Sequence, residues 1–357
     1  MNFILNLIMF ALVLGIIVMI HELGHLIAAK AFGVYCHEFA IGMGPKIASY
    51  KKPGGETKYS IRALPLGGYV AMAGEDVPAD ALDGVHVPLE RTIDGIKPWK
   101  RLIVMLAGIF MNFVLAFLIF WGLLFAQGTV EPPAPIIESV QAGYPAEKAG
   151  LMAGDEIIKM TFFDGKSLVP ETFNDVLMAL TTYEDRAVTL TVKRGSDTLD
   201  LELQPEYLAE ENRYIIGVII PQGKVRELGL FEAAGTSVLQ IKMIISQFFF
   251  LITRLVRGIG LDNVGGPIGI FEVTSQVRTQ GFVFFLSLVA MLSVNLGVVN
   301  ILPIPVMDGG RALLTIIEMI LGRPINKKLE NFIMNIGMML LFALFIFIMY
   351  NDIRKKF

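Results

Sequence analysis

Long runs of apolar residues alternate with polar segments along this chain. Three runs, Phe3–Ile20, Leu102–Ala126 and Phe332–Tyr350, reach the roughly 18 apolar residues that a helix needs to cross a bilayer. A fourth, Phe282–Ile301, is apolar apart from a few serines and asparagines. The first run lacks a basic start and a small-residue cleavage site, so we expect it to be retained. The pattern predicts an α-helical membrane protein with about four transmembrane helices.

A further segment, Leu230–Val256, has helical spacing but a mixed character. Its polar and charged interruptions are Gln240, Lys242, Gln247 and Arg254. Such a sequence favours an amphipathic helix at the membrane interface over a full span.

Between the second and third spans the chain resembles a soluble domain. Alternating runs such as VTLTVKR, TLDLELQ and YIIGVII predict β-strands separated by polar turns. The stretch GYPAEKAGLMAGDEIIKM, Gly143–Met160, is similar to the helix, turn and strand of a PDZ domain. We therefore predict an inserted α+β PDZ-like domain that either binds a ligand or excludes intact ectodomains by size. The predicted regions are 1–127, with two spans; 128–225, the PDZ-like domain; 226–281, the interfacial segment; and 282–357, with the last two spans.

Composition supports an integral membrane protein. Only 18% of the 357 residues are charged and 54% are hydrophobic, with a mean hydropathy of +0.62, whereas about a quarter of the residues in soluble domains are charged. The formal net charge of −3 gives no support for nucleic-acid binding. The single cysteine, Cys36, excludes an intrachain disulfide.

Basic residues predict the orientation, because short loops rich in lysine and arginine stay in the cytoplasm. The segment Lys30–Arg101 contains many such residues, so we expect it inside. The PDZ-like domain at 128–225 is then extracytoplasmic. The basic tail NDIRKKF would also lie outside, which counts against this orientation.

Two histidines and a glutamate lie at the end of the first apolar run, in VMIHELGHLIAAK, Val18–Lys30. Residues four apart share a helix face, so His21 and His25 project side by side and can share one metal ion. Glu22 is then placed to act as a general base toward a water molecule. Ionisable groups within a span are costly and mostly functional, which favours a metal site over a polar helix contact.

A catalytic zinc site needs a third protein ligand. The metzincin pattern is excluded, because Ala28 and Ala31 stand where it requires glycine and histidine. Acidic candidates in the first loop, which has a different character, are Glu38, Glu56 and Glu75. Another candidate is Asp308 in NILPIPVMDGG, Asn300–Gly310, whose prolines predict an irregular backbone. Irregular backbone at membrane depth is tolerated where it is buried in protein or lines a wet cavity, as a zinc site between spans requires.

HELGH together with N-x-x-P-x-x-x-x-D-G resembles the site-2 protease family of intramembrane zinc metalloproteases, in its bacterial branch of regulator-of-sigma-E-protease type. IGMGPKI (Ile41–Ile47) is similar to the family's glycine-rich segment, and YSIRALPLGGYVAM (Tyr59–Met72) to its membrane-associated β-hairpin. NVGGPIGI (Asn263–Ile270) resembles the segment before the third span. AGIFMNFVLA departs from the pattern, with Ile109 where proline is common, which affects the packing of the second span.

The resemblance implies a Zn²⁺ ion bound by His21, His25 and Asp308, with Glu22 as the general base. It implies regulated intramembrane proteolysis of single-span membrane proteins, such as anti-sigma factors or remnant signal peptides, in contact with membrane lipid. A multi-pass location in a bacterial cell membrane follows from the same resemblance.

Three further residues are candidates for substrate binding. Asn300 is implied to orient the substrate or to polarise the scissile carbonyl, the alternative being an interhelical hydrogen bond. Gly68 and Tyr69 lie on the expected hairpin, whose edge could pair with an unwound substrate strand. For Tyr69 the alternative is a simple turn anchor.

Two other classes of function compete with proteolysis. A catalytically idle scaffold that holds partners through its PDZ-like domain predicts loss of a residue from the HELGH and aspartate pair, yet all of them are present. A metal transporter predicts ligands spread along several spans, but the middle spans are too apolar. The sequence therefore predicts an intramembrane zinc endopeptidase.

Overall fold

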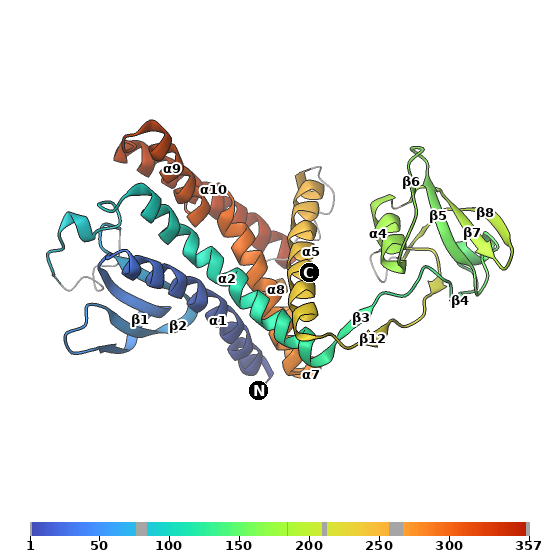
Figure 1. The fold of residues 1–357 in the computed structure, drawn as a ribbon, viewed down its shortest axis with the longest axis horizontal. Helices are drawn as coiled ribbons and strands as arrows, with labels where there is room; N and C mark the ends of the chain where they lie inside the picture. The colour runs from blue at the N-terminus through green and yellow to red at the C-terminus, as the bar shows by residue number, and fades with distance from the viewer. Residues whose placement is uncertain (1, 76–83, 184, 209–212, 257–266, 355–357) are drawn as a thin grey trace. The chain divides into compact units, whose positions relative to one another are not determined.

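The computed structural model describes residues 2–75, 84–183, 185–208, 213–256 and 267–354. The chain divides into two compact units, Met1–Ala126 with Gly229–Phe357, and Gln127–Leu228. The first consists mainly of long helices and the second mainly of strands (Figure 1). Residues 263–266 of the NVGGPIGI segment lie outside the described residues.

Long helices form the framework of the first unit. Within the described ranges, five helices are long and apolar enough to cross a membrane: α1 (Asn2–Ala31), α2 (Pro98–Gln127), α5 (Leu230–Val256), α8 (Phe282–Ile301) and α10 (Lys327–Arg354). Helix α5 satisfies this criterion by length and composition, so the expectation of about four spans with an interfacial α5 stays a prediction. Shorter elements are η2 (Leu89–Arg91), α6 (Pro267–Ser275), α7 (Val277–Gln280) and α9 (Asp308–Leu321).

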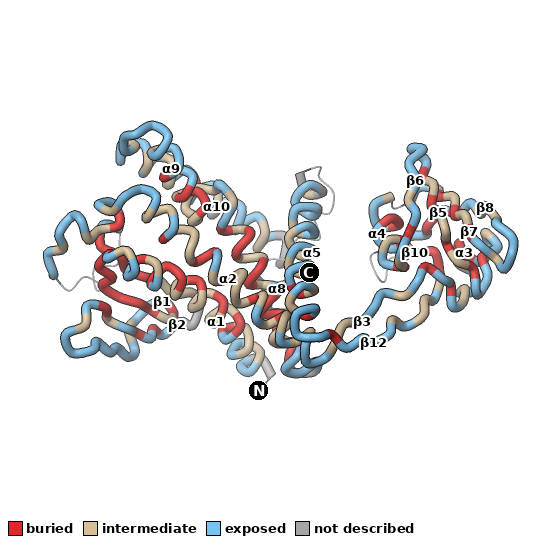
Figure 2. Tube along the Cα trace, viewed as in Figure 1, coloured by how far each residue is buried: buried red, intermediate tan, exposed pale blue. Residues whose placement is uncertain are grey.

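The long helices differ in how far they are buried: α2 and α8 are mostly buried or intermediate, whereas α5 and α10 are largely exposed (Figure 2). Buried Val13 and Ile17 of α1 belong to the same cluster as Phe285 and Leu288 of α8. A second cluster centred on α2 and α8 is covered by isoleucines of α5. By contrast, many apolar residues of α10 are exposed, and the side chain of Met339 reaches 73% exposure. Exposed apolar helix surface of this extent is what lipid tails would cover.

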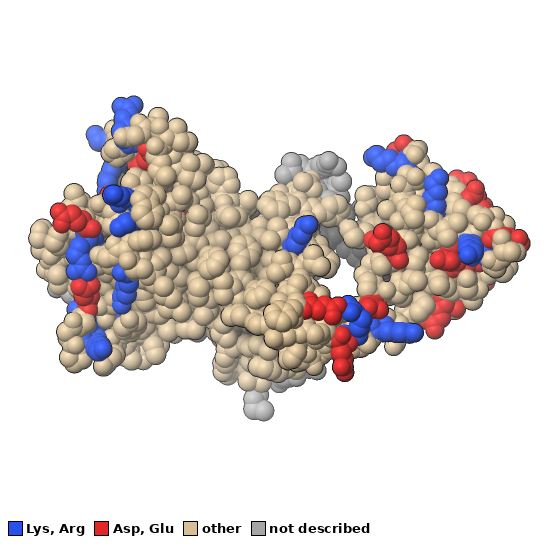
Figure 3. All heavy atoms as spheres, viewed as in Figure 1, with Lys and Arg blue, Asp and Glu red and all other residues tan. Residues whose placement is uncertain are grey.

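Charged side chains are unevenly distributed over this unit. In the face shown in Figure 3, lysine and arginine gather at the end that carries the β-hairpin, and the helices beyond it show a nearly uncharged surface. This distribution matches a helical body within lipid and a polar end outside it.

Strands β1 (Cys36–Lys51) and β2 (Lys58–Met72) form an antiparallel hairpin that curls back on itself. Ala40 pairs with both Ser60 and Tyr69, so the start of β1 lies between two parts of β2. Gly42 and Gly67 have φ values of 89° and 88°, a region that glycine adopts without strain, and they allow the bends. The end of β2 thereby becomes an edge of the small sheet.

The second unit is built around a four-stranded antiparallel sheet in the order β6–β5–β7–β8. These strands are β5 (Glu156–Phe162), β6 (Ser167–Leu168), β7 (Val188–Arg194) and β8 (Asp197–Leu203). Alternate residues of β7 are buried with Phe173 and Val176 of α4 (Phe173–Tyr183), because a strand turns every second side chain to one face. The unit also contains α3 (Pro145–Lys148) and the short antiparallel pairs β3 (Thr129–Glu131) with β12 (Lys224–Arg226), β4 (Ser139–Val140) with β11 (Val218–Ile219), and β9 (Glu206–Leu208) with β10 (Arg213–Ile215).

Candidate metal centre

Helix α1 carries both histidines of the HELGH motif on one face. The imidazole rings of His21 and His25 lie edge to face, with centroids 4.8 Å apart, and each residue is 6% exposed. Their Nε2 atoms are 3.2 Å apart. Uninterrupted helical spacing through the motif is what brings the two nitrogens together.

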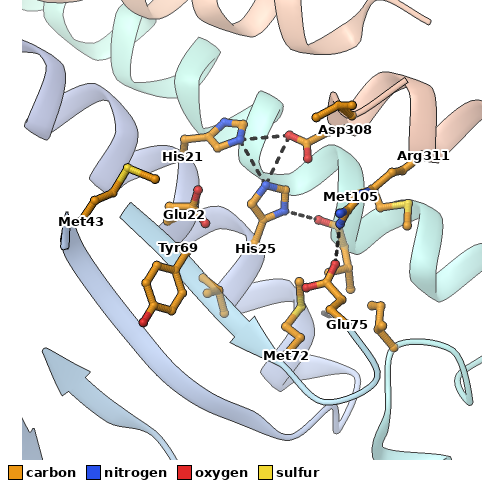
Figure 4. A pocket seen from close by; sticks show the side chains of 14 residues that line it. His21, Glu22, His25, Met43, Tyr69, Met72, Glu75, Met105, Asp308 and Arg311 are labelled. Carbon is orange, nitrogen blue, oxygen red and sulfur yellow. Dashed lines mark hydrogen bonds and ion pairs between the residues drawn. The ribbon is translucent and has the colours of Figure 1, made fainter. Parts of the chain in front are cut away.

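Asp308 approaches these histidines from the far end of the sequence. Its Oδ2 atom lies 3.0 Å from His21 Nε2 and 3.4 Å from His25 Nε2. The three side chains form the one cluster in the described residues in which at least three potential metal-ligand atoms lie within 4.8 Å of one another. Figure 4 shows them converging on one point, with α1 and α9 supplying the ligand atoms.

An irregular segment between α8 and α9 delivers this aspartate. Helix α8 ends at Ile301, and a turn closed by Met307 N–H donating to Ile304 O (3.1 Å) leads into α9, which begins at Asp308. Pro305 occupies the second position of this turn and Val306 the third, with φ at +84°. That combination defines a type II turn, in which glycine normally takes the third position. A β-branched residue there stores backbone strain of about 1–3 kcal/mol, a feature that often clusters at active sites.

The two glycines after Asp308 are needed for close packing. A Cβ on Gly309 would lie 2.4 Å from Ile301 O, and one on Gly310 would lie 2.2 Å from Ile304 O. Any larger residue would push the first turn of α9 away from the end of α8. The DGG sequence therefore holds the aspartate against the histidines.

Helix α2 forms a wall beside both imidazoles. The His25 Nδ1–H donates to Val104 O at 2.8 Å, and a Cβ on Gly108 would lie 2.4 Å from His25 Nε2. The Asn112 carboxamide lies 3.2 Å from His21 Nδ1. Sequence reasoning missed these contacts, although an asparagine inside an apolar span is a usable indication of function.

A cavity of about 390 Å³ opens beside the cluster. His21, Glu22, His25 and Asp308 contribute to its wall, with Tyr69 of β2. Glu22 and Tyr69 lie on the same side of the histidines in Figure 4. A carboxylate next to a histidine cluster in a partly apolar cavity is suited to proton transfer.

The three substrate-site candidates lie close to this cavity. The Asn300 carboxamide nitrogen is 3.4 Å from His21 Nε2. A Cβ on Gly68 would lie 3.7 Å from Glu22 Cγ, so the end of β2 passes directly beside that glutamate. The Tyr69 ring lines the cavity, while its hydroxyl donates to Glu38 Oε2 at 3.0 Å.

The other acidic residues of the first loop have different partners. Glu38 is fully buried and is bound by Arg62, Ser60 and Tyr69. Glu75 lines the cavity, and burial raises the pKa of its carboxyl even though Arg311 of α9 donates to it at 2.7 Å. Neither lies in the histidine cluster, so the structure assembles Asp308 rather than these residues with His21 and His25.

Comparison with known proteins identifies the family. The profile of peptidase family M50 matches residues 9–344. This chain belongs to peptidase family M50, the site-2 protease family. A protein named regulator of sigma-W protease RasP, from Bacillus subtilis (strain 168), is 32% identical over 429 aligned positions that cover 99% of this chain and 100% of that protein.

Other relatives carry the name zinc metalloprotease. One from Clostridium perfringens (strain 13 / Type A) is 36% identical over 94% of this chain and 95% of its own length. One from Staphylococcus aureus (strain COL) is 32% identical over the full length of both chains. A solved PDZ domain of an SdrC-like protein from Listeria monocytogenes is 19% identical over 25% of this chain and 90% of its own, and its TM-score of 0.21 is too low to establish a shared fold.

These matches establish the class of enzyme. This M50 peptidase is a zinc metalloprotease, and the prediction of the family, the enzyme class and the Zn²⁺ cofactor is confirmed. With its apolar helices, it is a multi-pass membrane protein.

Proposed function

We propose that this peptidase cleaves single-span membrane proteins within the membrane, with zinc held by His21, His25 and Asp308. The observation that carries the proposal is the convergence of three ligand atoms from α1 and α9 on one point beside a cavity. Two imidazoles and one carboxylate are a donor set typical of catalytic zinc.

The atoms at this point fit a cation. The bond from His25 Nδ1–H to Val104 O leaves the lone pair of His25 on Nε2, which faces the cluster. Asp308 Oδ2 is buried and accepts no hydrogen bond from any described residue. Electron-rich atoms 3.0–3.4 Å apart repel one another unless a positive charge lies between them. The zinc that this family uses supplies that charge, and when bound it polarises a carbonyl and acidifies water.

Glu22 would act as the general base. Its carboxylate lines the cavity one residue after His21 and belongs to no metal-ligand cluster in the described ranges. It would take a proton from the attacking water and deliver it to the amine that leaves when the peptide bond breaks.

The end of β2 would present the substrate. Gly68–Val70 pairs on one side with β1, and no other described strand pairs with its opposite side; Gly68 itself lies next to Glu22. A transmembrane helix hides its carbonyls in internal hydrogen bonds, so the segment to be cut must unwind. Pairing with an edge strand would hold it extended. Asn300, beside His21, would orient the scissile carbonyl.

The substrates would be single-span proteins such as anti-sigma factors or remnant signal peptides. Support comes from the long apolar helices of the chain, α1 with its two histidines among them, and from the similarity to RasP, which is named a regulator of sigma-W protease. We place the hairpin end in the cytoplasm and the unit Gln127–Leu228 outside it, as the basic residues of the first loop indicate.

The Gln127–Leu228 unit would serve as a PDZ-like domain that binds a ligand or screens ectodomains. Its four-stranded sheet, helix α4 and buried Leu151 in the GLMAGD turn support this assignment. The alternative, an idle scaffold, is disfavoured because His21, His25 and Asp308 are assembled into one cluster with Glu22 beside them.

The test separates the chemistry from metal binding. Glu22→Gln should keep about one zinc per chain and lower cleavage of a co-expressed single-span substrate by about 10²–10⁴-fold, because the amide accepts no proton. Asp308→Ala should lower the zinc content. Glu90→Gln, at an exposed site, is the matched control and should behave as wild type. Wild-type cleavage by zinc-loaded Glu22→Gln, or full zinc retention by Asp308→Ala, would overturn the respective role.

A further inference from the structure

One stripe of helix α2 contacts both histidines. Val104, Gly108 and Asn112 are spaced four residues apart, so they lie along the same face. Val104 O accepts the Nδ1–H of His25, Gly108 leaves space for the rings, and the Nδ2 atom of Asn112 lies 3.2 Å from the Nδ1 atom of His21. The two imidazoles are therefore approached in the same way, each through its Nδ1 atom.

Asn112 is an unusual residue at this position. It lies inside the apolar run of α2, is 0% exposed, and its Oδ1 atom has no hydrogen-bond partner in the described part of the chain. A buried polar atom without a partner costs about 1–3 kcal/mol. A side chain that is costly in a span and incompletely satisfied needs a functional explanation.

The protonation of His21 supplies that explanation. Its Nε2 atom faces Asp308 Oδ2 at 3.0 Å and His25 Nε2 at 3.2 Å, so Nε2 is the atom directed at the proposed metal position. A neutral imidazole that offers its Nε2 lone pair carries its proton on Nδ1. That Nδ1–H requires an acceptor. Rotating a carboxamide by 180° exchanges its oxygen and nitrogen, which would place the unpaired Asn112 Oδ1 beside the Nδ1–H of His21.

We infer that Asn112 is a positioning residue whose Oδ1 accepts the Nδ1–H of His21 and fixes the tautomer and ring orientation of that ligand. Val104 O does the same for His25. The inference rests on the zinc site proposed above. Loss of such an outer partner typically lowers metal affinity about 10–100-fold.

The surrounding structure holds Asn112 in register and offers a control. The Ser293 hydroxyl of α8 donates to the Asn112 backbone carbonyl at 3.0 Å, and Ser293 is 0% exposed. Ser293→Ala therefore removes a buried hydrogen bond from the same residue without touching its carboxamide. A purely structural role for Asn112 would make the two sites behave alike.

The experiment measures the zinc affinity of the purified full-length chain by competition with a chelator. Asn112→Leu keeps the approximate size and removes the acceptor, so it should weaken zinc binding about 10–100-fold. Asn112→Asp restores an acceptor oxygen and should bind zinc at least as tightly as wild type. Ser293→Ala should stay within about twofold. The absorption spectrum of the Co²⁺-loaded protein should change in Asn112→Leu and be restored in Asn112→Asp.

His21→Ala separates this inference from the proposed site. Full zinc retention by His21→Ala would overturn the ligand set itself. Loss of zinc from His21→Ala, with Asn112→Leu within about twofold of wild type, would overturn the role of Asn112 alone. Weak zinc binding by Asn112→Asp would also overturn the role of Asn112 alone. Thermal unfolding of the metal-free proteins checks folding; if Asn112→Leu does not fold, a tenfold affinity loss in Asn112→Asp is the refuting result.

Discussion

Gly108→Ala adds one methyl group where α2 comes closest to the histidines. The new Cβ would lie 2.4 Å from His25 Nε2 and 2.8 Å from His21 Cε1. Ordinary van der Waals contact begins near 3.4 Å, so the His25 ring would have to move by about 1 Å. It cannot do so freely, because its Nδ1 atom is bonded to Val104 O at 2.8 Å.

Two consequences should follow from this displacement. Overpacking of a well-filled site costs about 1–3 kcal/mol. A misplacement of about 1 Å at a catalytic site costs about 10²-fold in rate. We therefore expect Gly108→Ala to fold with reduced stability, to bind zinc more weakly and to cleave a single-span substrate about 10²-fold more slowly than wild type.

A glycine on the same helix gives the matched control. Apart from its chain neighbours and its own helix backbone, a Cβ on Gly122 would meet no heavy atom of the described residues within 4 Å. Gly122→Ala should therefore leave zinc binding unchanged and stabilise α2 by up to about 1 kcal/mol, because alanine is the better helix former. The assay measures zinc content, thermal unfolding and fragment yield on the same preparations. Wild-type zinc affinity and cleavage in Gly108→Ala would show that the imidazoles do not lie against α2.

Three further predictions concern strain, pH and orientation. Val306→Gly should raise the thermal unfolding temperature, because the relief of about 1–3 kcal/mol of strain outweighs the roughly 0.5–1 kcal/mol entropic cost of glycine. A lower unfolding temperature would contradict the turn geometry. The hydrogen bond from the Arg194 guanidinium holds the pKa of Asp155 below its ordinary 3.8, so this pair should stabilise its unit above about pH 4 and lose that effect as the pH falls through the lowered pKa. Measured by hydrogen exchange, the loss of stability of this unit on acidification should be smaller in Asp155→Asn than in wild type, and an equal loss would refute the pairing. Ser196→Cys in a Cys36→Ser background should react with a membrane-impermeant thiol reagent in intact cells, whereas labelling only after lysis would reverse the proposed orientation. Burial raises the pKa of the Cys36 thiol to about 11, so labelling of Cys36 itself should be low even where it is not replaced.

Local physics made much of this protein predictable from its sequence. A bilayer of fixed thickness demands apolar runs of a certain length, so such runs indicate spanning helices without any knowledge of their packing. Helical periodicity places His21 and His25 on one face in the same way. The alternation in VTLTVKR and TLDLELQ corresponds to the observed strands β7 and β8. The mixed run Leu230–Val256 marks the limit of this reasoning, because hydropathy alone leaves both a span and an interfacial helix open.

Only the tertiary structure decides what surrounds the histidines. The sequence assigns Asp308 as the third ligand only through a resemblance, since no local rule connects two segments almost three hundred residues apart. The curl that places Gly68 beside Glu22 depends on pairing within the whole hairpin. The stripe of Val104, Gly108 and Asn112 acquires its meaning only when α2 lies against α1. Helical periodicity determines which residues share a face. The helix that packs against that face is set by close packing between segments distant in the sequence, and no local sequence pattern indicates which segment that is.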